Sequence, residues 1–437
     1  MADERIEGLE ARLAAGNATV GVVGLGYVGL PLAVAFAEAR LKVIGFDILP
    51  QRVRAVNDGH SYIPDVASDR LRRVRADERL EATTDKDRLA EPDALVLCVP
   101  TPLTPTREPD LHYVVFEAEE IARRLRPAQL IVLESTTYPG TTDDLVRPIL
   151  LRSGLNAEDF FLAYSPERID PGSRTHSIRN TPKLVGGVDA ASTRLAAALY
   201  RHVADEVIPV SSPRVAEMAK VFENVFRAVN IALVNELAQL CEKMGMDVWQ
   251  VIRAASSKPF GFMPFWPGPG VGGHCIPLDP YYLASKAREY GFHTRFIELA
   301  GDINEEMPTY VARRIADCLN ARGKSVHGAR ILLLGVSYKR DIGDVRESPA
   351  LTLYRILEEW GAQLAYCDPF LPEVQIGSRR VTALPLNASE LSTWDCVVIA
   401  VDHTGVDYES VVARAPLVFD SRGVTAGLAP RANVVRL

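Results

Sequence analysis

Apolar residues in the first half of the chain form short, uninterrupted runs at helix-sized intervals. Residues 19–25, TVGVVGL, stop at glycines, LPLAVAFAEAR follows with a helical pattern, and KVIGFD ends in an acid. Strand, turn, helix and strand in this order indicate a βαβ unit of a parallel sheet. The further runs ALVLCVP, LIVLEST, FFLAYSPE, KLVGG and EVIPV predict a doubly wound α/β domain over residues 1–205.

The pattern changes near Ser211. The segment SPRVAEMAKVFENVFRAVNIALVNELAQLCEKMG has apolar residues at helical spacing for over 30 positions. Ser211 or Ser212 can cap this helix, and Pro213 suits its first turn. After a glycine-rich loop, the pattern predicts one further long helix over residues 281–322. We therefore expect a central helical domain over residues 206–322.

Strand-like runs return at ARILLLGVSYK and continue with LAYCDP, CVVIAVDH, LVFDSRG and NVVRL. They predict a second, smaller α/β domain over residues 323–437. The expected fold class is α/β, with two Rossmann-like, doubly wound parallel-sheet domains joined by a long central helix and a helical middle domain.

Composition and charge narrow the classes of function. The chain has 437 residues and a formal net charge of −7, so we expect no nucleic-acid partner, although a phosphate site needs only local basic groups. None of the six cysteines forms a CxxC pair, and we predict no metal site. The acidic N-terminus is not a signal peptide and no apolar run approaches a membrane span. We therefore expect a reduced, cytoplasmic protein with no membrane contact.

The first predicted strand runs into a glycine motif, GLGYVG, at residues 24–29. A helix follows the motif, and Asp47 closes the next strand about 20 residues on, where an acid would hydrogen-bond a ribose diol. The glycines would let the backbone approach a pyrophosphate at the helix N-terminus. Asp47 would repel a 2′-phosphate, so the motif favours NAD over NADP, and Arg52 weakens this preference only a little. A plain glycine turn is the alternative.

Three polar residues follow other predicted strands. They are Thr101 in CVPTP, Thr136 in ESTTYPG and Glu167 in YSPERIDPG. In open α/β sheets this edge holds the ligand, which makes them candidate site residues. Alternatively, each threonine is a turn residue that bonds its own backbone, and the glutamate is solvated surface.

Lys220 and Asn224 stand four positions apart on the long predicted helix and share a face, which Arg227 extends. Because their neighbours are apolar, they are candidates for holding an oxyanion and a water. A polar stripe on a surface helix is the alternative.

The glycine-rich stretch GVGGHCIPLDP, residues 270–280, contains Cys275. A loop thiol is more often placed for its sulfur chemistry than for packing. A thiolate can add to an aldehyde as a thiohemiacetal, whose oxidation gives a thioester that water hydrolyses to an acid. This path needs a nucleophilic thiol, an oxyanion stabiliser and a base, and Cys275, Lys220 and Asp279 are residues of these types. His274 is a candidate for lowering the thiol pKa, although adjacent loop residues point apart.

The alternative for Cys275 is an unreactive loop cysteine, and a cysteine hydrolase would leave the dinucleotide motif without a purpose. In the last domain, GVSYKRDIGDVRES follows the first strand and lacks GxGxxG. Lys339, Arg340 and Arg346 stand there instead, which indicates a phosphate bound by side chains. The second ligand is therefore expected to be a phosphorylated molecule other than NAD.

Together these residues resemble the UDP-glucose/GDP-mannose dehydrogenase family of NAD-dependent nucleotide-sugar 6-dehydrogenases. The likeness covers nearly the whole chain and includes GLGYVGLPLA, ESTTYPGTT, YSPER, AKVFENVFRAVNIALVNEL, PGPGVGGHCIPLDPYYL and YKRDIGDVRESPA. SPERIDPG and PGPGVGGHCIPLDP look most like the branch that acts on N-acetylated UDP-hexosamines such as UDP-GlcNAc. Pro171 stands where UDP-glucose members commonly carry a second glutamate, which argues against UDP-glucose and leaves fewer carboxylates for acid–base work.

The resemblance implies a role for each candidate. Cys275 would be the nucleophile, and Lys220 would stabilise the oxyanion or move protons. Asn224 with Asp279 would order the hydrolytic water. Thr136 and Glu167 would line the reacting carbon. The residues implied to contact NAD are Gly24, Gly26, Tyr27, Val28, Gly29, Asp47, Arg52, Thr101, Thr136 and Arg346. Those implied to hold the UDP-sugar are Arg168, Ile169, Lys220, Asn224, Arg227, Phe265, Gly272, Lys339 and Arg422.

We therefore expect a four-electron oxidation of the C6 hydroxymethyl of a UDP-sugar, UDP-GlcNAc foremost, through a cysteine thiohemiacetal and thioester. UDP-ManNAc, UDP-GalNAc and UDP-glucose stay open as substrates. A two-electron NAD dehydrogenase with an inert cysteine and a non-catalytic sensor stay open as functions. The family also implies a homodimer on the long helix, with a higher oligomer as the alternative, and a product that feeds surface polysaccharide.

Overall fold

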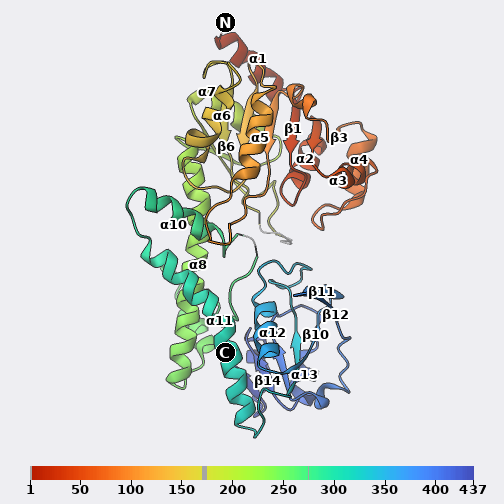
Figure 1. Ribbon diagram of the computed structural model, residues 1–437, viewed down its shortest axis with the longest axis vertical. Helices are drawn as coiled ribbons and strands as arrows, with labels where there is room; N and C mark the ends of the chain where they lie inside the picture. The colour runs from red at the N-terminus through yellow and green to blue at the C-terminus, as the bar shows by residue number, and fades with distance from the viewer. Residues whose placement is uncertain (1, 170–174, 274) are drawn as a thin grey trace. The chain divides into compact units, whose positions relative to one another are not determined.

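The apolar runs of the N-terminal half become strands of one sheet in the computed structural model, which describes residues 2–169, 175–273 and 275–437 (Figure 1). The strands are β1 Thr19–Val23, β2 Lys42–Phe46, β3 Leu80–Thr83, β4 Ala94–Leu97, β5 Leu130–Leu133, β6 Phe161–Tyr164, β7 Lys183–Gly187 and β8 Val207–Pro209. Their order is β3-β2-β1-β4-β5-β6-β7-β8. The pairs from β3 to β6 are parallel, in the strand order of a Rossmann fold.

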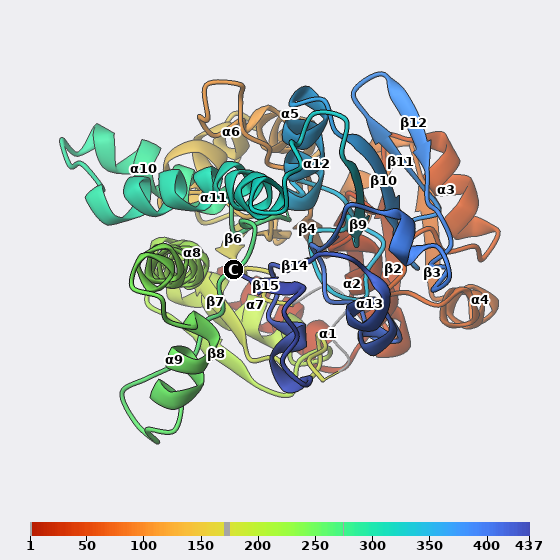
Figure 2. The same cartoon turned by 90° about the horizontal axis from the view of Figure 1, so that it is seen from below.

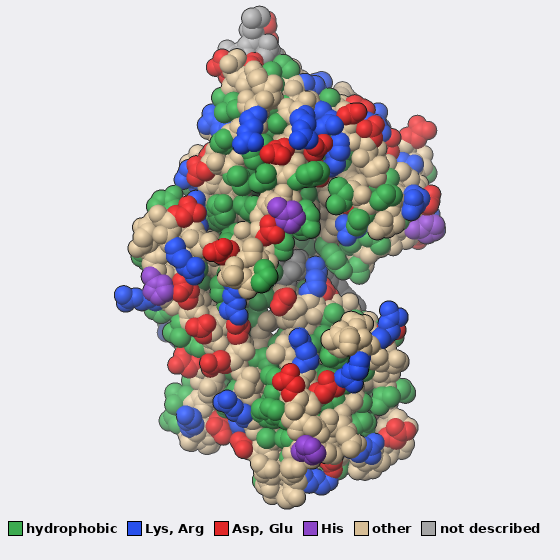
Figure 3. Space-filling view, in the orientation of Figure 1, with side chains coloured by type: hydrophobic (Ala, Val, Ile, Leu, Met, Phe, Trp, Pro, Cys, Tyr) green, Lys and Arg blue, Asp and Glu red, His purple; other side chains and the backbone are tan. Residues whose placement is uncertain are grey.

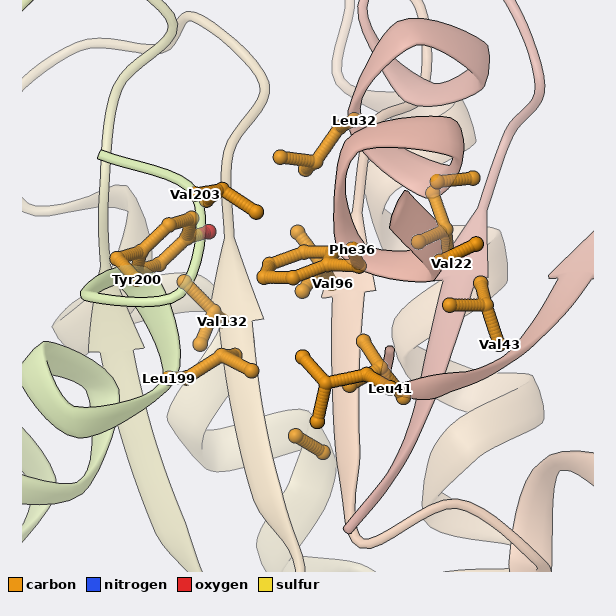
Figure 4. Packing of buried hydrophobic residues seen from close by; sticks show 14 of the residues in the cluster. Val22, Leu32, Phe36, Leu41, Val43, Val96, Val132, Leu199, Tyr200 and Val203 are labelled. Atoms are coloured by element: carbon orange, nitrogen blue, oxygen red, sulfur yellow. The ribbon is translucent and has the colours of Figure 1, made fainter. Parts of the chain in front are cut away.

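Helices cover both faces of this sheet because successive strand residues point to opposite sides. Val22 packs into one apolar cluster with residues of α1, α2 and α7, and Val23 into another with residues of α5 and α6. In Figure 4, Phe36 of α2 lies over Val96 with its ring toward Tyr200 of α7, at a centroid distance of 6.0 Å. The helices are α1 Ala2–Ala14, α2 Gly29–Glu38, α3 Pro50–Asn57, α4 Ser68–Ala76, α5 His112–Ala122, α6 Arg147–Leu151 and α7 Ala190–Tyr200, with the short turns η1 Lys86–Ala90 and η2 Thr141–Val146.

One pair in this sheet runs the other way. β7 is antiparallel to β6, with Ala163 opposite Gly187 and Tyr164 opposite Gly186, and β8 is parallel to β7. Apolar runs carry no sign of strand direction, so the sequence did not predict this reversal. The first residue of β7 consequently lies at the edge where β5 and β6 end.

The C-terminal runs form a second sheet in the order β10-β9-β13-β14-β15, with every pair parallel. Its strands are β9 Arg330–Leu334, β10 Gln363–Cys367, β13 Cys396–Ile399, β14 Val418–Asp420 and β15 Val434–Arg436. Residues of α12 (Pro349–Glu359) and of α13 (Tyr408–Arg414) pack with alternate residues of β9, so the two helices cover opposite faces (Figure 2). A hairpin of β11 (Glu373–Ile376) and β12 (Arg379–Thr382), which the sequence did not predict, follows β10. The remaining short turns are η3 Leu391–Thr393 and η4 Val424–Gly427.

The first long helix forms as predicted, and the second does not. α8 spans Pro213–Lys243, and the Val215 N–H lies 3.4 Å from the Ser212 hydroxyl that caps it. The prediction of one helix over residues 281–322 is wrong, because α10 (Asp279–Glu289) and α11 (Arg295–Asn320) are separate helices. Gly291, at φ +67°, takes the left-handed conformation that ends α10. The short helix α9 spans Val248–Ala255.

The described chain divides into two compact units. One comprises the residues up to Glu223 together with Tyr281–Phe292, and the other comprises Asn224–Pro280 and His293–Leu437. The division into domains at 205 and 322 stays a prediction. Among the described helices, none has both the length and the apolar character needed to cross a membrane. Acidic and basic side chains are interspersed over the face in Figure 3.

Candidate active site

The glycine motif forms a tight turn between β1 and α2. Gly24 has φ +90°, and a Cβ there would lie 2.6 Å from the Cys98 carbonyl oxygen. A Cβ on Gly29 would lie 1.8 Å from the Gly24 carbonyl oxygen, so neither position accepts another residue. A Cβ on Gly26, in contrast, would meet nothing within 4 Å. The backbone at Gly26 is therefore open to a ligand at the N-terminus of α2, as a pyrophosphate requires.

Asp47 fastens this turn. Its carboxylate accepts the N–H groups of Leu25 and Leu49, each at 2.9 Å, and lies 3.3 Å from Nη1 of Arg52. Asp47 is 4% exposed, and its bond to Leu25 places the carboxylate beside the start of the turn. Its position at the end of β2 is the one that a ribose-binding acid takes.

The two threonine candidates lie at the same edge of the first sheet. Thr101, half-buried after β4, accepts a hydrogen bond on its carbonyl from the hydroxyl of Tyr282 at 2.6 Å. Thr136 follows β5 and is also half-buried. The loop beyond Thr136 is anchored on α8, because the buried Glu217 carboxylate accepts the N–H of Gly140 at 2.6 Å and that of Thr142 at 2.9 Å. Burial raises the pKa of Glu217.

Glu167 lies where β6 ends and is held on both carboxylate oxygens. Oε1 accepts the N–H groups of Arg168 at 2.7 Å and Ile169 at 2.8 Å, and Oε2 lies 3.6 Å from Nζ of Lys183. Burial opposes ionisation of Glu167, but the Lys183 ammonium and the two N–H groups outweigh it and hold its pKa below the ordinary value. The Arg168 guanidinium pairs with Glu223 of α8, at 2.6 Å from Nη2 to Oε1.

Two side chains of α8 that were predicted as site residues are buried. Lys220 is 6% exposed and Asn224 is fully buried. The Asn224 side-chain amide donates to the Asp279 carboxylate and accepts from the Arg227 guanidinium. Asn224, Arg227 and Asp279 therefore form one hydrogen-bonded group within the second unit.

Cys275 lies in the turn that leads into α10. Its carbonyl accepts the N–H groups of Leu278 at 3.1 Å and Asp279 at 2.8 Å, so Cys275 and Asp279 are one helical turn apart. The Cys275 side chain is half-exposed and Asp279 is buried. A partly accessible cysteine thus precedes by one helical turn an aspartate whose carboxylate is held by the Asn224 amide.

The glycines before Cys275 are there because the loop packs closely. A Cβ on Gly272 would lie 2.6 Å from the Cβ of Tyr338, and one on Gly273 would lie 3.0 Å from the Tyr338 ring. The Gly273 N–H also donates to the Arg346 carbonyl at 3.0 Å. The glycine-rich sequence therefore seats the cysteine loop against the loop that follows β9.

The basic residues after β9 are paired with acids of their own unit. Arg340 pairs with Asp402, and Arg346 lies with its Nε 3.0 Å from Oδ2 of Asp344. Arg422 lies 3.3 Å from the other oxygen of Asp402, and a Cβ on Gly268 would lie 2.5 Å from its Nη1. Lys339 is half-buried.

Phe265, also half-buried, packs its ring edge against Phe226 at a centroid distance of 5.7 Å.

Three segments of the chain match the UDP-glucose/GDP-mannose dehydrogenase family. Residues 18–204 match its NAD binding domain, 214–306 its central domain and 332–427 its UDP binding domain. The chain belongs to this family.

Relatives with full-length similarity support the assignment. A UDP-N-acetyl-D-glucosamine 6-dehydrogenase of Pseudomonas aeruginosa is 37% identical over 388 residues, 88% of this chain and 90% of that protein. A UDP-N-acetyl-D-mannosamine dehydrogenase of Escherichia coli is 35% identical over 402 residues, 89% of this chain and 94% of that protein. The solved structure of UDP-D-ManNAc dehydrogenase from Pyrococcus horikoshii has a TM-score of 0.86 and 32% identity, and covers 96% of this chain and 98% of that one.

This member of the family is an NAD-dependent UDP-sugar dehydrogenase with NAD as its cofactor. The open backbone at Gly26 and the acid at Asp47 fit that cofactor. Sequence reasoning missed Glu134, Lys183 and Glu217, which hold the predicted residues or their loops in place. Two residues it used, Pro171 and His274, lie outside the described residues. The described residues contain no cluster of three His, Cys, Asp or Glu side chains able to hold a metal ion.

Proposed function

We propose that this dehydrogenase oxidises the C6 hydroxymethyl of a UDP-N-acetylhexosamine, UDP-GlcNAc foremost, to a carboxylate. The balanced reaction takes one alcohol, two NAD⁺ and one water to one carboxylate, two NADH and three protons. The observation that carries the proposal is the hydrogen bond between Asn224 and Asp279, because Asp279 follows Cys275 by one helical turn. The relatives named for UDP-GlcNAc and UDP-ManNAc support the N-acetylated substrate class.

When bound, NAD⁺ accepts the hydride in each of the two oxidations. In this account the Cys275 thiolate adds to the carbon of the aldehyde, and the carbonyl electron pair moves to oxygen. Lys220 stabilises that oxygen and supplies its proton, which gives a thiohemiacetal. After the second oxidation the product on Cys275 is a thioester.

Hydrolysis of the thioester is assigned to Asn224 and Asp279. Asp279 takes a proton from water as the water attacks the thioester carbon, and the Cys275 thiolate leaves. A hydrogen bond from Asn224 holds the Asp279 carboxylate, so it needs no rearrangement to act as the base. Thr136 and Glu167 are proposed to line the reacting carbon.

Two further sets of residues are proposed to bind the ligands. NAD would be held by Gly24, Gly26, Tyr27, Val28, Gly29, Asp47, Arg52, Thr101, Thr136 and Arg346. The UDP-sugar would be held by Arg168, Ile169, Arg227, Phe265, Gly272, Lys339 and Arg422. The acids that pair with Arg346 and Arg422 would keep these guanidinium groups in place for an anionic ligand.

The test measures how many moles of NADH form per mole of limiting sugar nucleotide. The substrates compared are UDP-GlcNAc, UDP-ManNAc, UDP-GalNAc and UDP-glucose. A ratio near two with UDP-GlcNAc supports the proposal. A ratio near two with another sugar keeps the chemistry and changes the substrate. A ratio near one would leave the thioester path without support and favour a two-electron dehydrogenase.

We also propose that α8 forms a homodimer interface. The exposed side chains along this helix include large apolar ones at helical spacing: Val215, Met218, Phe222, Phe226, Leu233 and Leu240. Phe222 and Leu233 are each 60% exposed, which is costly for a stripe facing water. Sedimentation of the wild type against a Phe222→Glu variant tests this interface. A cytoplasmic location and a role in polysaccharide synthesis stay predictions.

A further inference from the structure

The reversal of β7 brings a lysine to the carboxyl ends of β5 and β6. The β6–β7 register pairs Ala163 with Gly187 and Tyr164 with Gly186. Continued by three residues, this register sets Glu167 opposite Lys183. Glu134, the residue that follows β5, completes a cluster of three charged side chains at one edge of the sheet.

These three side chains have little contact with solvent. The exposed fractions are 5% for the Lys183 side chain, 0% for Glu134 and 16% for Glu167. Nζ of Lys183 donates to Oε1 of Glu134 and lies 3.6 Å from Oε2 of Glu167. The hydroxyl of Tyr200, the last residue of α7, donates to the second oxygen of Glu134. The buried Cys98 thiol after β4 interacts electrostatically with all three side chains, and Lys220 of α8 contributes to the lowered pKa of Glu167.

Lys183 is shared between two buried carboxylates, whereas Lys220 and two backbone N–H groups act on Glu167, so a proton is favoured on Glu134. Glu167 has two backbone N–H groups besides Lys183, whereas Glu134 has a tyrosine hydroxyl besides Lys183 and is more deeply buried. Burial raises the pKa of Glu134 to about 7, and that of Glu167 is lowered. Deeper burial of Glu134 and the two N–H donors on Glu167 therefore assign the proton to Glu134 and the negative charge to Glu167. In the protonated state Glu134 replaces the Tyr200 hydroxyl as the donor in the hydrogen bond at Oε2.

We propose that Glu134 and Lys183 are positioning residues for Glu167. Glu134 takes up the proton and Lys183 presents the cation, and together they keep Glu167 an anion with its carboxylate fixed toward the substrate. The proposal rests on the proposed function only in placing Glu167 at the reacting carbon. It also accounts for acid–base chemistry in a chain with proline at position 171. The second carboxyl group beside Glu167 is that of Glu134, which follows the neighbouring strand β5.

The first test needs no activity. Infrared spectra of the full chain between pH 5 and 9 report the carbonyl stretch of a protonated carboxylic acid. The wild type is expected to show a band that titrates near pH 7 and that Glu134→Gln removes. Glu167→Gln should keep the band, but the band should titrate at a lower pH than in the wild type. The reason is that the Lys183 ammonium then interacts with Glu134 alone and lowers its pKa. Absence of the band, or its loss in Glu167→Gln and not in Glu134→Gln, would overturn the proposal.

The second test is the pH dependence of kcat. Lys183→Met should raise the acidic limb by about one pH unit or more, because Glu167 loses its cation. Lys183→Arg keeps the cation and should leave the limb in place. The double variant Glu134→Gln/Lys183→Met removes both the lysine and the carboxyl group that it bonds, so no buried carboxylate is left without its partner at position 134. It should show the raised limb even if Lys183→Met folds poorly.

A lower kcat with an unmoved limb would make Lys183 merely structural and overturn the proposal. Failure of the proposed sugar oxidation is a different outcome. It would appear as no NADH from the wild type, and the infrared titration would still decide where the proton lies.

Discussion

The side-chain amide of Asn224 donates a hydrogen bond to the carboxylate of Asp279, and neither residue has appreciable contact with solvent. These residues are 55 positions apart in the chain. A buried carboxylate that loses its donor keeps the full cost of its desolvation. The pair therefore links stability to the proposed hydrolytic step.

Asn224→Ala is expected to lower the free energy of unfolding by about 1–3 kcal/mol and to slow hydrolysis more than the first oxidation. Urea denaturation and rapid-mixing measurements of NADH formation check the two effects. Asn230→Ala is the matched control, because Asn230 is half-buried on the same helix and its side chain donates to the Phe226 carbonyl of the same helix. Equal losses in both variants would mean that Asn224 has no particular role in hydrolysis.

Glu217→Ala should disturb the loop after β5. The substitution removes the acceptor of the Gly140 and Thr142 N–H groups, which are buried with it. We expect a loss of about 2–4 kcal/mol in unfolding free energy, since hydrogen bonds to a charged group are among the stronger ones. Glu217→Gln keeps an acceptor oxygen and should lose less. An unchanged denaturation midpoint in Glu217→Ala would contradict this anchoring.

The stability of the protein should fall as the pH rises through about 7, in part because of Glu134. Burial raises the pKa of Glu134 from 4.5 to about 7 in the folded state, so the folded state binds more protons than the unfolded state between these values. Its contribution, up to roughly 3 kcal/mol, is fully present below pH 4.5 and is lost as Glu134 ionises. Denaturation of the wild type and Glu134→Gln from pH 5 to 8 checks this. Parallel pH profiles for the two proteins would show that Glu134 does not titrate in this range.

Gly26→Ala should fold normally and bind NAD poorly. The new Cβ would meet no protein atom within 4 Å, so it projects into the space left for the cofactor. We expect an increase of tenfold or more in the Kd for NAD, which corresponds to about 1.4 kcal/mol. Gly427→Ala is the control, because its Cβ also meets nothing within 4 Å and lies in the other unit. Unchanged NAD binding in Gly26→Ala would place the pyrophosphate elsewhere.

The sequence predicted the parts of the site that depend on local pattern. The spacing of Gly24 and Gly26 between an apolar strand and a helix, with Asp47 at the end of the next strand, predicted where the turn and the acid lie. The helix break at Gly291 was missed because a single glycine in a helical pattern is often tolerated.

The supporting charges could not be predicted in the same way. Glu134 and Lys183 are 49 positions apart, and they meet only because β7 runs antiparallel to β6. Glu217 was one polar residue among many on a long helix, and its partners Gly140 and Thr142 lie in a distant loop. The one local signal was a charged residue next to an apolar strand, in LIVLE and KLVGG.

The covalent path through Cys275 is tested most directly by the mass of the intact protein quenched during turnover. Asp279→Asn, incubated with NAD⁺ and UDP-GlcNAc, should accumulate a thioester because its hydrolytic base is gone. The expected mass increase is that of the sugar nucleotide less the four hydrogens that two oxidations remove, and a peptide map should place it on Cys275. The Asp279→Asn/Cys275→Ser variant should show no increase. A rate of NADH formation equal to that of the wild type, with no adduct on Cys275 in Asp279→Asn, would contradict the covalent path.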